Sequence, residues 1–118
     1  MGAVSGNEVL ERRIHLSRLY DLYGPLLTER QRRVYEMHEL DDLSLSEISS
    51  ELNISRQGVS DQLTKVRERL EEIERLLGFA DTLNRIESSA RAILEGKNSD
   101  AHARSIIEAC GGRTSDHV

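Results

Sequence analysis

The sequence predicts an all-α fold in which a helix-turn-helix continues into a long helix and is followed by C-terminal helices. Three observations support this class. The composition is 3% aromatic and 31% charged, which is typical of helices rather than of a β-sandwich or barrel. Apolar residues recur at three- and four-residue spacing along most of the chain. Two short helical segments are separated by a very tight turn, and 118 residues are enough for one ordinary domain.

The N-terminal part is expected to begin with a flexible lead over residues 1–7. The apolar spacing over residues 9–23 then predicts a first helix. The Gly24-Pro25 pair ends this helix, because glycine and proline both interrupt helical geometry.

Two capping boxes mark the starts of the next helices. Thr28 with Gln31, and Ser44 with Glu47, have the spacing at which a hydroxyl and a long polar side chain satisfy each other's backbone N–H groups. We therefore expect a second helix from residue 28 to about residue 38, and a third through Leu52.

A tight turn should join the third helix to the fourth. Asn53 suits a left-handed C-cap because asparagine tolerates positive φ. Ser55 then provides the N-cap of the next helix only two residues later. Two helices joined in this way form a helix-turn-helix.

The helix after Ser55 is expected to be long, because apolar residues alternate in steps of four and three over about three heptads until Gly78. This apolar stripe consists of Val59, Leu63, Val66, Leu70, Ile73 and Leu77. The expected organisation is a helix-turn-helix domain at residues 8–77, a helical extension at 78–110 and a disordered tail at 111–118.

The end of the stripe is open to two interpretations. Leu70, Ile73 and Leu77 extend beyond the helix-turn-helix, and they could cover the C-terminal helices or form the seam of a homodimer. The cost of exposing apolar surface on so small a chain favours the dimer.

Composition also limits the compartment and the partners. A single cysteine, Cys110, fits a reducing cytoplasm, and no apolar run is long enough for membrane insertion. The net charge is −5, and residues 36–53 carry six acidic groups but no lysine or arginine. This balance weakens nonspecific attraction to nucleic acid but leaves room for a small basic face.

Enzymatic chemistry has no support in the sequence. The chain contains no GxxxxGK[ST] phosphate-binding loop and no serine or cysteine in a nucleophile motif. The four histidines are scattered, without cysteine or carboxylate at metal-ligand spacing. We expect no catalytic residue, no metal site and no cofactor.

The arrangement from Ser44 to Leu63 resembles region four of bacterial sigma factors and related helix-turn-helix domains of the winged-helix-like DNA-binding class. In those domains the second helix enters the DNA major groove. The resemblance implies outward-facing residues for base edges and phosphates. The candidates are Arg56, Gln57, Ser60, Thr64, Lys65 and Arg67.

The alternative is a helix-turn-helix that serves only as a packing unit with a solvated polar face. Asp61 lies beside the candidate face and would repel phosphate. The preceding helix offers Glu47 and Glu51 but no cation, where many DNA-binding proteins place backbone contacts.

Arg30 and Arg33 form a second, weaker candidate for backbone contacts, since they lie one turn apart and share a helix face. The favoured alternative for these two residues is pairing with Glu29 and Glu36 within the helix.

A closer resemblance covers residues 16–77. Four blocks, at residues 19–23, 26–31, 41–48 and 54–61, are similar in order and spacing to the YlxM-type family of small bacterial helix-turn-helix proteins. Ser55-Arg56-Gln57, followed by a small residue and Val59, is the most telling part.

The YlxM-type resemblance implies an accessory or regulatory role in the signal recognition particle pathway, through the particle's RNA or its GTPase subunit. The basic group Arg56, Lys65, Arg67 and Arg69 could grip RNA phosphates. Shape and backbone contacts would dominate, because the deep, narrow major groove of RNA excludes a helix. The acidic residues 36–53 could instead meet a basic surface of the GTPase subunit. Two alternatives stay open: a transcriptional regulator that binds duplex DNA, and a protein-interaction adaptor.

Overall fold

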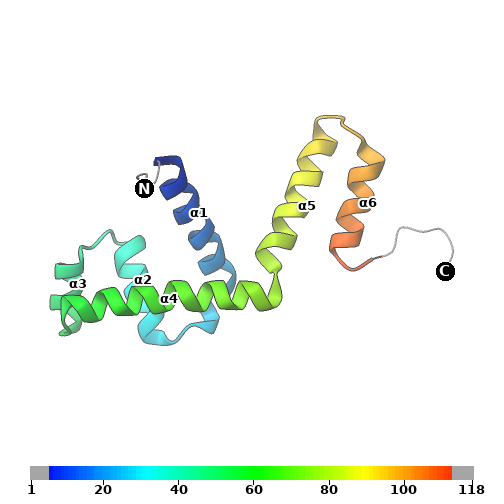
Figure 1. Cartoon of the computed structure of the whole chain (residues 1–118). Helices are drawn as coiled ribbons and strands as arrows, with labels where there is room; N and C mark the ends of the chain where they lie inside the picture. Colours follow the sequence, from blue (N-terminus) through cyan, green and yellow to red (C-terminus); the bar gives the residue numbers. More distant parts are fainter. Residues whose placement is uncertain (1–5, 113–118) are drawn as a thin grey trace, which may run out of the picture. The chain divides into compact units, whose positions relative to one another are not determined.

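The computed structural model describes residues 6–112, and this part of the chain is helical without any β-strand (Figure 1). The α-helices are α1 (Gly6–Tyr23), α2 (Glu29–Glu39), α3 (Leu45–Leu52), α4 (Arg56–Leu77), α5 (Phe79–Leu94) and α6 (Ser99–Ala109), and a short 3₁₀-helix, η1, spans Gly24–Leu26. The chain divides into two units between Leu77 and Gly78. The predicted all-α helix-turn-helix fold is confirmed.

Local sequence signals place the helix boundaries in the first unit. Both predicted capping boxes form, with the Thr28 side chain accepting from the Gln31 backbone N–H at 3.1 Å and Ser44 accepting from Glu47 at 3.1 Å. Asn53 ends α3 in the left-handed conformation, with φ 57°. These predictions are confirmed because each depends on contacts within one turn of helix.

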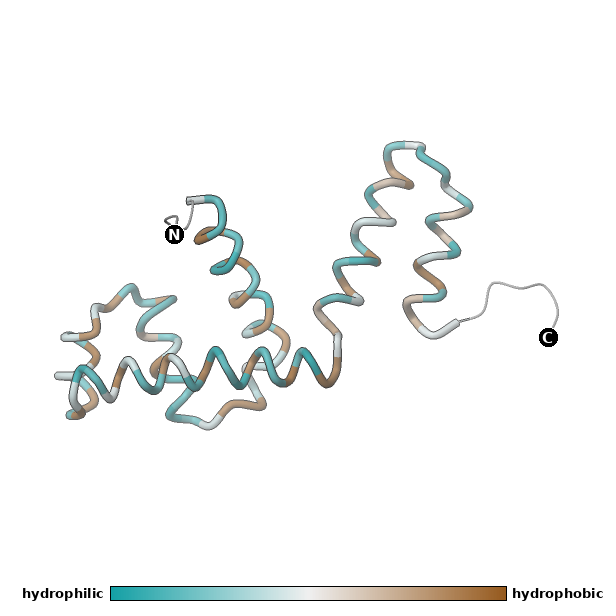
Figure 2. Tube along the Cα trace, viewed as in Figure 1, coloured by the Kyte–Doolittle hydropathy of each residue, from teal (hydrophilic) through white to brown (hydrophobic). Residues whose placement is uncertain are grey.

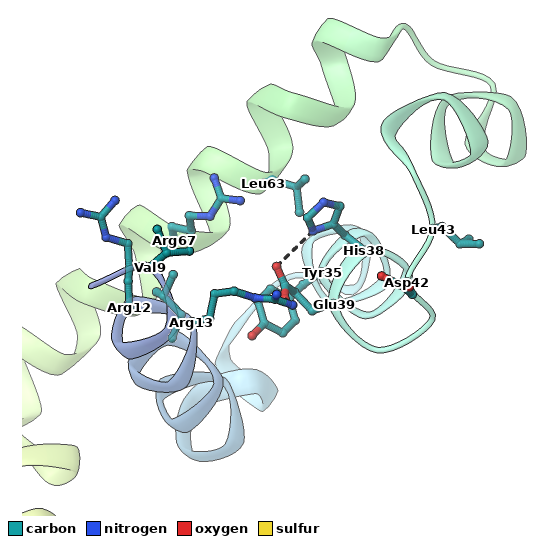
Figure 3. Close-up of a pocket in the computed structure, with 11 residues that line it drawn as sticks. Val9, Arg12, Arg13, Tyr35, His38, Glu39, Asp42, Leu43, Leu63 and Arg67 are labelled. Carbon is teal, nitrogen blue, oxygen red and sulfur yellow. Dashed lines mark hydrogen bonds and ion pairs between the residues drawn. The ribbon is translucent and has the colours of Figure 1, made fainter. Parts of the chain in front are cut away.

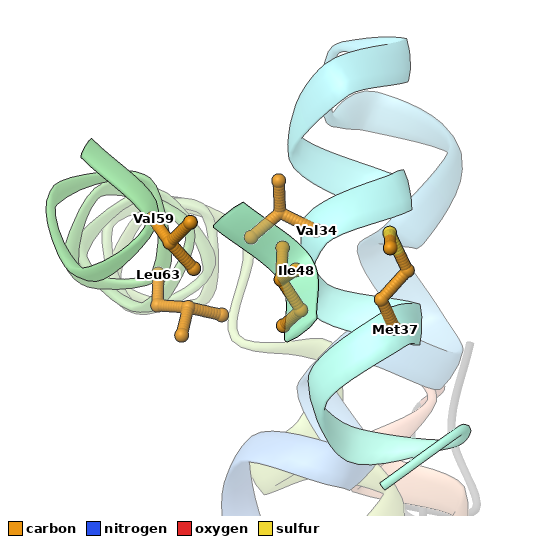
Figure 4. Packing of buried hydrophobic residues seen from close by; sticks show 5 residues of the cluster. All are labelled: Val34, Met37, Ile48, Val59 and Leu63. Atoms are coloured by element: carbon orange, nitrogen blue, oxygen red, sulfur yellow. The ribbon is translucent and has the colours of Figure 1, made fainter. Parts of the chain in front are cut away.

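The core of the first unit holds α2, α3 and α4 together. Its buried side chains are Val34, Met37, Ile48, Val59 and Leu63, and they interdigitate from the three helices in Figure 4. Leu43, Leu45, Leu52 and Ile54 pack against this cluster at its edge. The helix-turn-helix is therefore fixed on both sides of its turn.

Helix α1 packs against α4 and crosses it at a steep angle toward its C-terminal half, as Figure 1 shows. The Tyr23 hydroxyl donates to Glu74 at 2.6 Å, and the His15 imidazole bonds to Glu71 at 2.8 Å. Leu19 is fully buried and Tyr23 nearly so. Tyr20 stacks on Tyr35 of α2, with ring centroids 4.2 Å apart.

This packing corrects the interpretation of the apolar stripe. Leu70 and Ile73 are 0% and 4% exposed and lie where α1 crosses α4, so they belong to the core of one chain. Leu77 is 47% exposed and is the only member of the stripe left outside. The argument that an open stripe favours a dimer therefore no longer applies to Leu70 and Ile73. Figure 2 shows the alternation of apolar and polar residues along α4.

The second unit is a hairpin of α5 and α6. Its turn uses positive φ at Gly96 (76°) and Asn98 (40°). The buried residues at its interior are small, Ala80 and Ser89, and Leu94 is 88% exposed beside the turn. A core this thin gives the hairpin little apolar burial.

The ends of the chain differ slightly from expectation. Helix α1 begins at Gly6, inside the segment expected to be a flexible lead, and Glu8 in its first turn interacts favourably with the helix dipole. Residues 1–5 and 113–118 lie outside the described residues, so most of the expected lead and tail is not described. Gly111 and Gly112 follow α6 outside any helix.

The burial of α4 leads to a stability prediction with a matched control on the same helix. Leu70→Ala should lower the free energy of unfolding by about 2–5 kcal/mol, because it removes a buried side chain and leaves a cavity. Leu77→Ala makes the same change one heptad later at an exposed position and should cost much less. Urea unfolding followed by circular dichroism measures both, and equal losses would contradict the assignment of Leu70 to the core.

Candidate nucleic-acid interface

The turn between α3 and α4 is held by side-chain hydrogen bonds at both ends. The Ser49 hydroxyl donates to the Ile54 carbonyl at 2.5 Å, across the turn. Ser55 Oγ accepts from the Gly58 backbone N–H at 2.9 Å, which confirms its role as the N-cap of α4. The first turn of α4 is therefore rigidly placed relative to α3.

The structure leaves most of the predicted binding residues accessible. Arg56, Gln57, Thr64, Lys65 and Arg67 are exposed, and Ser60 is half-buried. Within residues 6–112, the positively charged groups of Arg56, Lys65 and Arg67 form no ion pair. These side chains are available to an external partner.

The predicted residues do not all share one side of α4. Steps of four and three in a continuous helix place Arg56, Ser60, Thr64 and Arg67 in one row along its length. We call these four residues the α4 row. Lys65 follows Arg56 by about two and a half turns and so lies on the opposite side of the helix.

The α4 row runs toward α1. One turn beyond Arg67 on the same side is Glu71, which bonds to His15 of α1. Glu74 continues the row and accepts from Tyr23. The arginines of the α4 row are thus exposed, whereas Glu71 and Glu74, which follow the row on the same side of α4, bond to α1.

Two acidic side chains, Asp61 and Glu68, lie on the solvent-exposed surface of α4. The Gln57 side-chain amide donates to Asp61 at 2.9 Å, one turn along the helix. The Gln57 amide keeps its second N–H and its carbonyl oxygen, but this bond holds the side chain toward Asp61.

The acidic residues of α3 are not equivalent. The Glu47 carboxylate accepts from the Ser44 backbone N–H at 2.9 Å, and this bond, assisted by the Ser44 hydroxyl, lowers the pKa of Glu47 below its usual range. The Glu47 carboxylate therefore forms part of the N-terminal cap of α3, whereas the Glu51 side chain is exposed to solvent.

The second basic group is exposed as well. Arg30 and Arg33 lie on the surface of α2, and in residues 6–112 neither forms an ion pair with Glu29 or Glu36. Glu36 instead accepts from the Tyr20 hydroxyl of α1. Both arginines stay candidates for backbone contacts.

The structure adds a cleft that the sequence did not indicate. It has a volume of about 490 Å³ and lies among α1, α2 and α4 (Figure 3). Arg67, at the end of the α4 row, lines it together with Arg12 and Arg13 of α1. The adjacent arginines of α1 were the only signal in the sequence, and their partner on α4 is more than fifty residues away.

One carboxylate organises part of this cleft. Glu39 accepts from Arg13 at 3.2 Å and bonds to His38 at 3.1 Å. Burial, together with the charge of Glu39, raises the pKa of Tyr35 to about 12.

Other classes of site find no support in the part of the chain that the structure describes. Residues 6–112 contain no group of three or more histidine, cysteine or acidic side chains arranged to hold a metal ion. Within the same range, no helix has both the length and the apolar character needed to cross a bilayer.

Comparison with known proteins identifies the family. A family model described as "Putative helix-turn-helix protein, YlxM / p13 like" matches residues 10–109. The chain belongs to this family. The match extends the resemblance seen in the sequence beyond residue 77 and through α5 and α6.

Relatives in the YlxM / p13-like family, all described as UPF0122 proteins, are similar over most of the chain. One from Thermoanaerobacter sp. (strain X514) is 39% identical over 101 residues, covering 80% of this chain and 86% of the relative. One from Shouchella clausii is 35% identical over 102 residues, covering 86% and 90%. One from Caldanaerobacter subterraneus is 50% identical over 66 residues, covering 56% of each.

The cap of α3 gives a prediction about pH. Because the pKa of Glu47 is lowered in the folded state, its contribution to stability is present above the ordinary carboxyl pKa and is lost as the pH falls through the folded value. Ser44→Ala should destabilise the fold by about 1 kcal/mol. It should also raise the pKa of Glu47 only part of the way, since the backbone donor stays.

NMR titration of the Glu47 side chain measures this pKa. Thr28→Ala removes the hydroxyl of the other capping box and serves as the control, because it should leave Glu47 unchanged. A Glu47 pKa that moves equally in both variants would show a global loss of structure rather than a local cap.

Proposed function

We propose that this protein is a non-enzymatic, nucleic-acid-binding accessory protein that acts through the α4 row. The observation that carries the proposal is the row itself. Its arginines, Arg56 and Arg67, are exposed and without an ion-pair partner in the described residues, on a helix that the helix-turn-helix core holds rigidly. Arginine suits phosphate because its planar guanidinium can donate two parallel hydrogen bonds.

The ligand we propose is the RNA of the signal recognition particle, in the cytoplasm. Support for this choice comes from the YlxM-type resemblance, and the chain's exposed lone cysteine fits a reducing compartment. The narrow major groove of A-form RNA excludes α4, so the row would follow phosphates rather than read base pairs. The GTPase subunit is a further partner in this proposal, through the acidic residues 36–53.

Duplex DNA is the second candidate ligand, and one specific observation favours it. Arg56 and Gln57 occupy the first turn of α4, where helix-turn-helix proteins present side chains to base edges in the major groove. Arginine pairs with guanine and glutamine with adenine. A transcriptional regulator would use this turn for direct readout.

Charge reversal on the two sides of α4 tests the proposal. Arg56→Glu with Arg67→Glu should lower affinity for signal recognition particle RNA about tenfold or more, because it replaces two phosphate contacts with repulsion. Lys65→Glu with Arg69→Glu changes the net charge equally on the opposite side of the same helix and should have a much smaller effect. Fluorescence anisotropy with labelled RNA, and with random duplex DNA at matched salt, measures both.

The salt dependence of binding provides a second readout. Each lost phosphate contact should reduce the slope of log affinity against log salt by about 0.7 to 0.9. Equal losses in the two double variants would indicate diffuse attraction and would contradict a site on the α4 row. Tighter binding to one DNA sequence than to the RNA would favour the regulator. Binding to the GTPase subunit alone would favour an adaptor.

A further inference from the structure

The cleft among α1, α2 and α4 combines apolar walls with unpaired positive charge. Val9 and Leu16 of α1, Leu43 after α2, and Leu63 of α4 supply apolar lining. Val9 is 48% exposed, which places an apolar side chain in contact with solvent at the cleft. The volume of about 490 Å³ lies within the range of roughly 300–1,000 Å³ that small-molecule sites occupy.

The charges of the cleft divide into two sets. The carboxylate of Glu39 pairs with Arg13 at 3.2 Å and bonds to His38 at 3.1 Å. Arg12 and Arg67 form no ion pair in the described residues, although both line the cleft. Asp42 is the one other carboxylate in the lining, so the cleft keeps a positive balance that suits an anionic ligand.

The cleft is continuous with the proposed interface. Arg67 belongs both to the α4 row and to the cleft lining, on the side of α4 that faces α1. A nucleic-acid backbone that follows the row from Arg56 therefore arrives at Arg67 and then at Arg12. In Figure 3, Arg12 and Arg13 extend from α1 and Arg67 extends from α4, each in a different direction.

We propose that this cleft accepts an unpaired nucleotide of the RNA that the α4 row binds. Arg12 and Arg67 would hold its phosphates, and the base would lie against the apolar side chains of Val9 and Leu16 on α1. Proteins recognise RNA sequence mainly through unpaired bases, which pack on apolar, aromatic or guanidinium surfaces. This inference rests on the proposed function, and it adds a preference for RNA with single-stranded nucleotides.

Two neighbouring residues of α1 provide a matched test. Val9 lines the cleft, whereas Leu10 is similarly exposed, at 56%, and lines a different part of the surface. Val9→Glu should lower affinity for signal recognition particle RNA at least about fivefold, because it places a carboxylate among the phosphates. Leu10→Glu, with the same change in charge, should stay within about twofold. Arg12→Glu should behave like Val9→Glu.

A fully paired RNA duplex is the second probe. Val9→Glu should bind this duplex like the wild type, because the duplex offers the α4 row and Arg12 a backbone but offers the cleft no unpaired nucleotide. In the wild type, the methyl NMR signals of Val9 and Leu16 should shift with particle RNA and stay in place with the duplex. This measurement needs no variant and therefore does not depend on how a substitution folds.

The outcomes separate the two proposals. Equal effects of Val9→Glu and Leu10→Glu, or equal losses by Val9→Glu on both RNAs, would overturn the nucleotide site while leaving the α4 row intact. Loss of binding to the GTPase subunit with RNA affinity unchanged would assign the cleft to a peptide and would also overturn it. A wild-type protein that binds no nucleic acid would refute the proposed function itself.

Discussion

The burial of the apolar stripe of α4 is the interaction on which the rest of the first unit depends. Three other helices cover this stripe in turn: α3 and α2 near its start and α1 near its end. Each fully buried leucine or valine contributes roughly 1.5–3 kcal/mol relative to exposure. The buried members of the stripe are Val59, Leu63, Val66, Leu70 and Ile73. Because one side of α4 is committed to the core, its other residues are oriented outward.

Most of the fold could be predicted from the sequence because hydrogen bonds between residues close in sequence set where the helices begin and end. A hydroxyl three residues before a glutamate or glutamine, and an asparagine at a C-cap, act within one turn of helix. The separation of Lys65 from the α4 row could also have been predicted, since it follows from the helical period alone. The six candidate residues therefore do not form a single face of α4.

The element that covers Leu70 and Ile73 could not be predicted from the sequence in the same way. Regular apolar spacing shows that a helix side is covered, but the same spacing fits a partner within the chain or a second copy. Only the tertiary position of α1 decides between them. The cleft was missed for the same reason, because Arg12 and Arg67 meet through packing between helices that are distant in sequence.

The distribution of aromatic side chains has a practical consequence for spectroscopy. The chain has no tryptophan, and its three tyrosines, Tyr20, Tyr23 and Tyr35, all lie where α1 meets α2 and α4. The second unit has only Phe79. Intrinsic tyrosine emission therefore reports on the first unit alone, whereas the far-ultraviolet helix signal sums both. A difference between these two signals during heating would reveal independent melting of the α5–α6 hairpin without any added label.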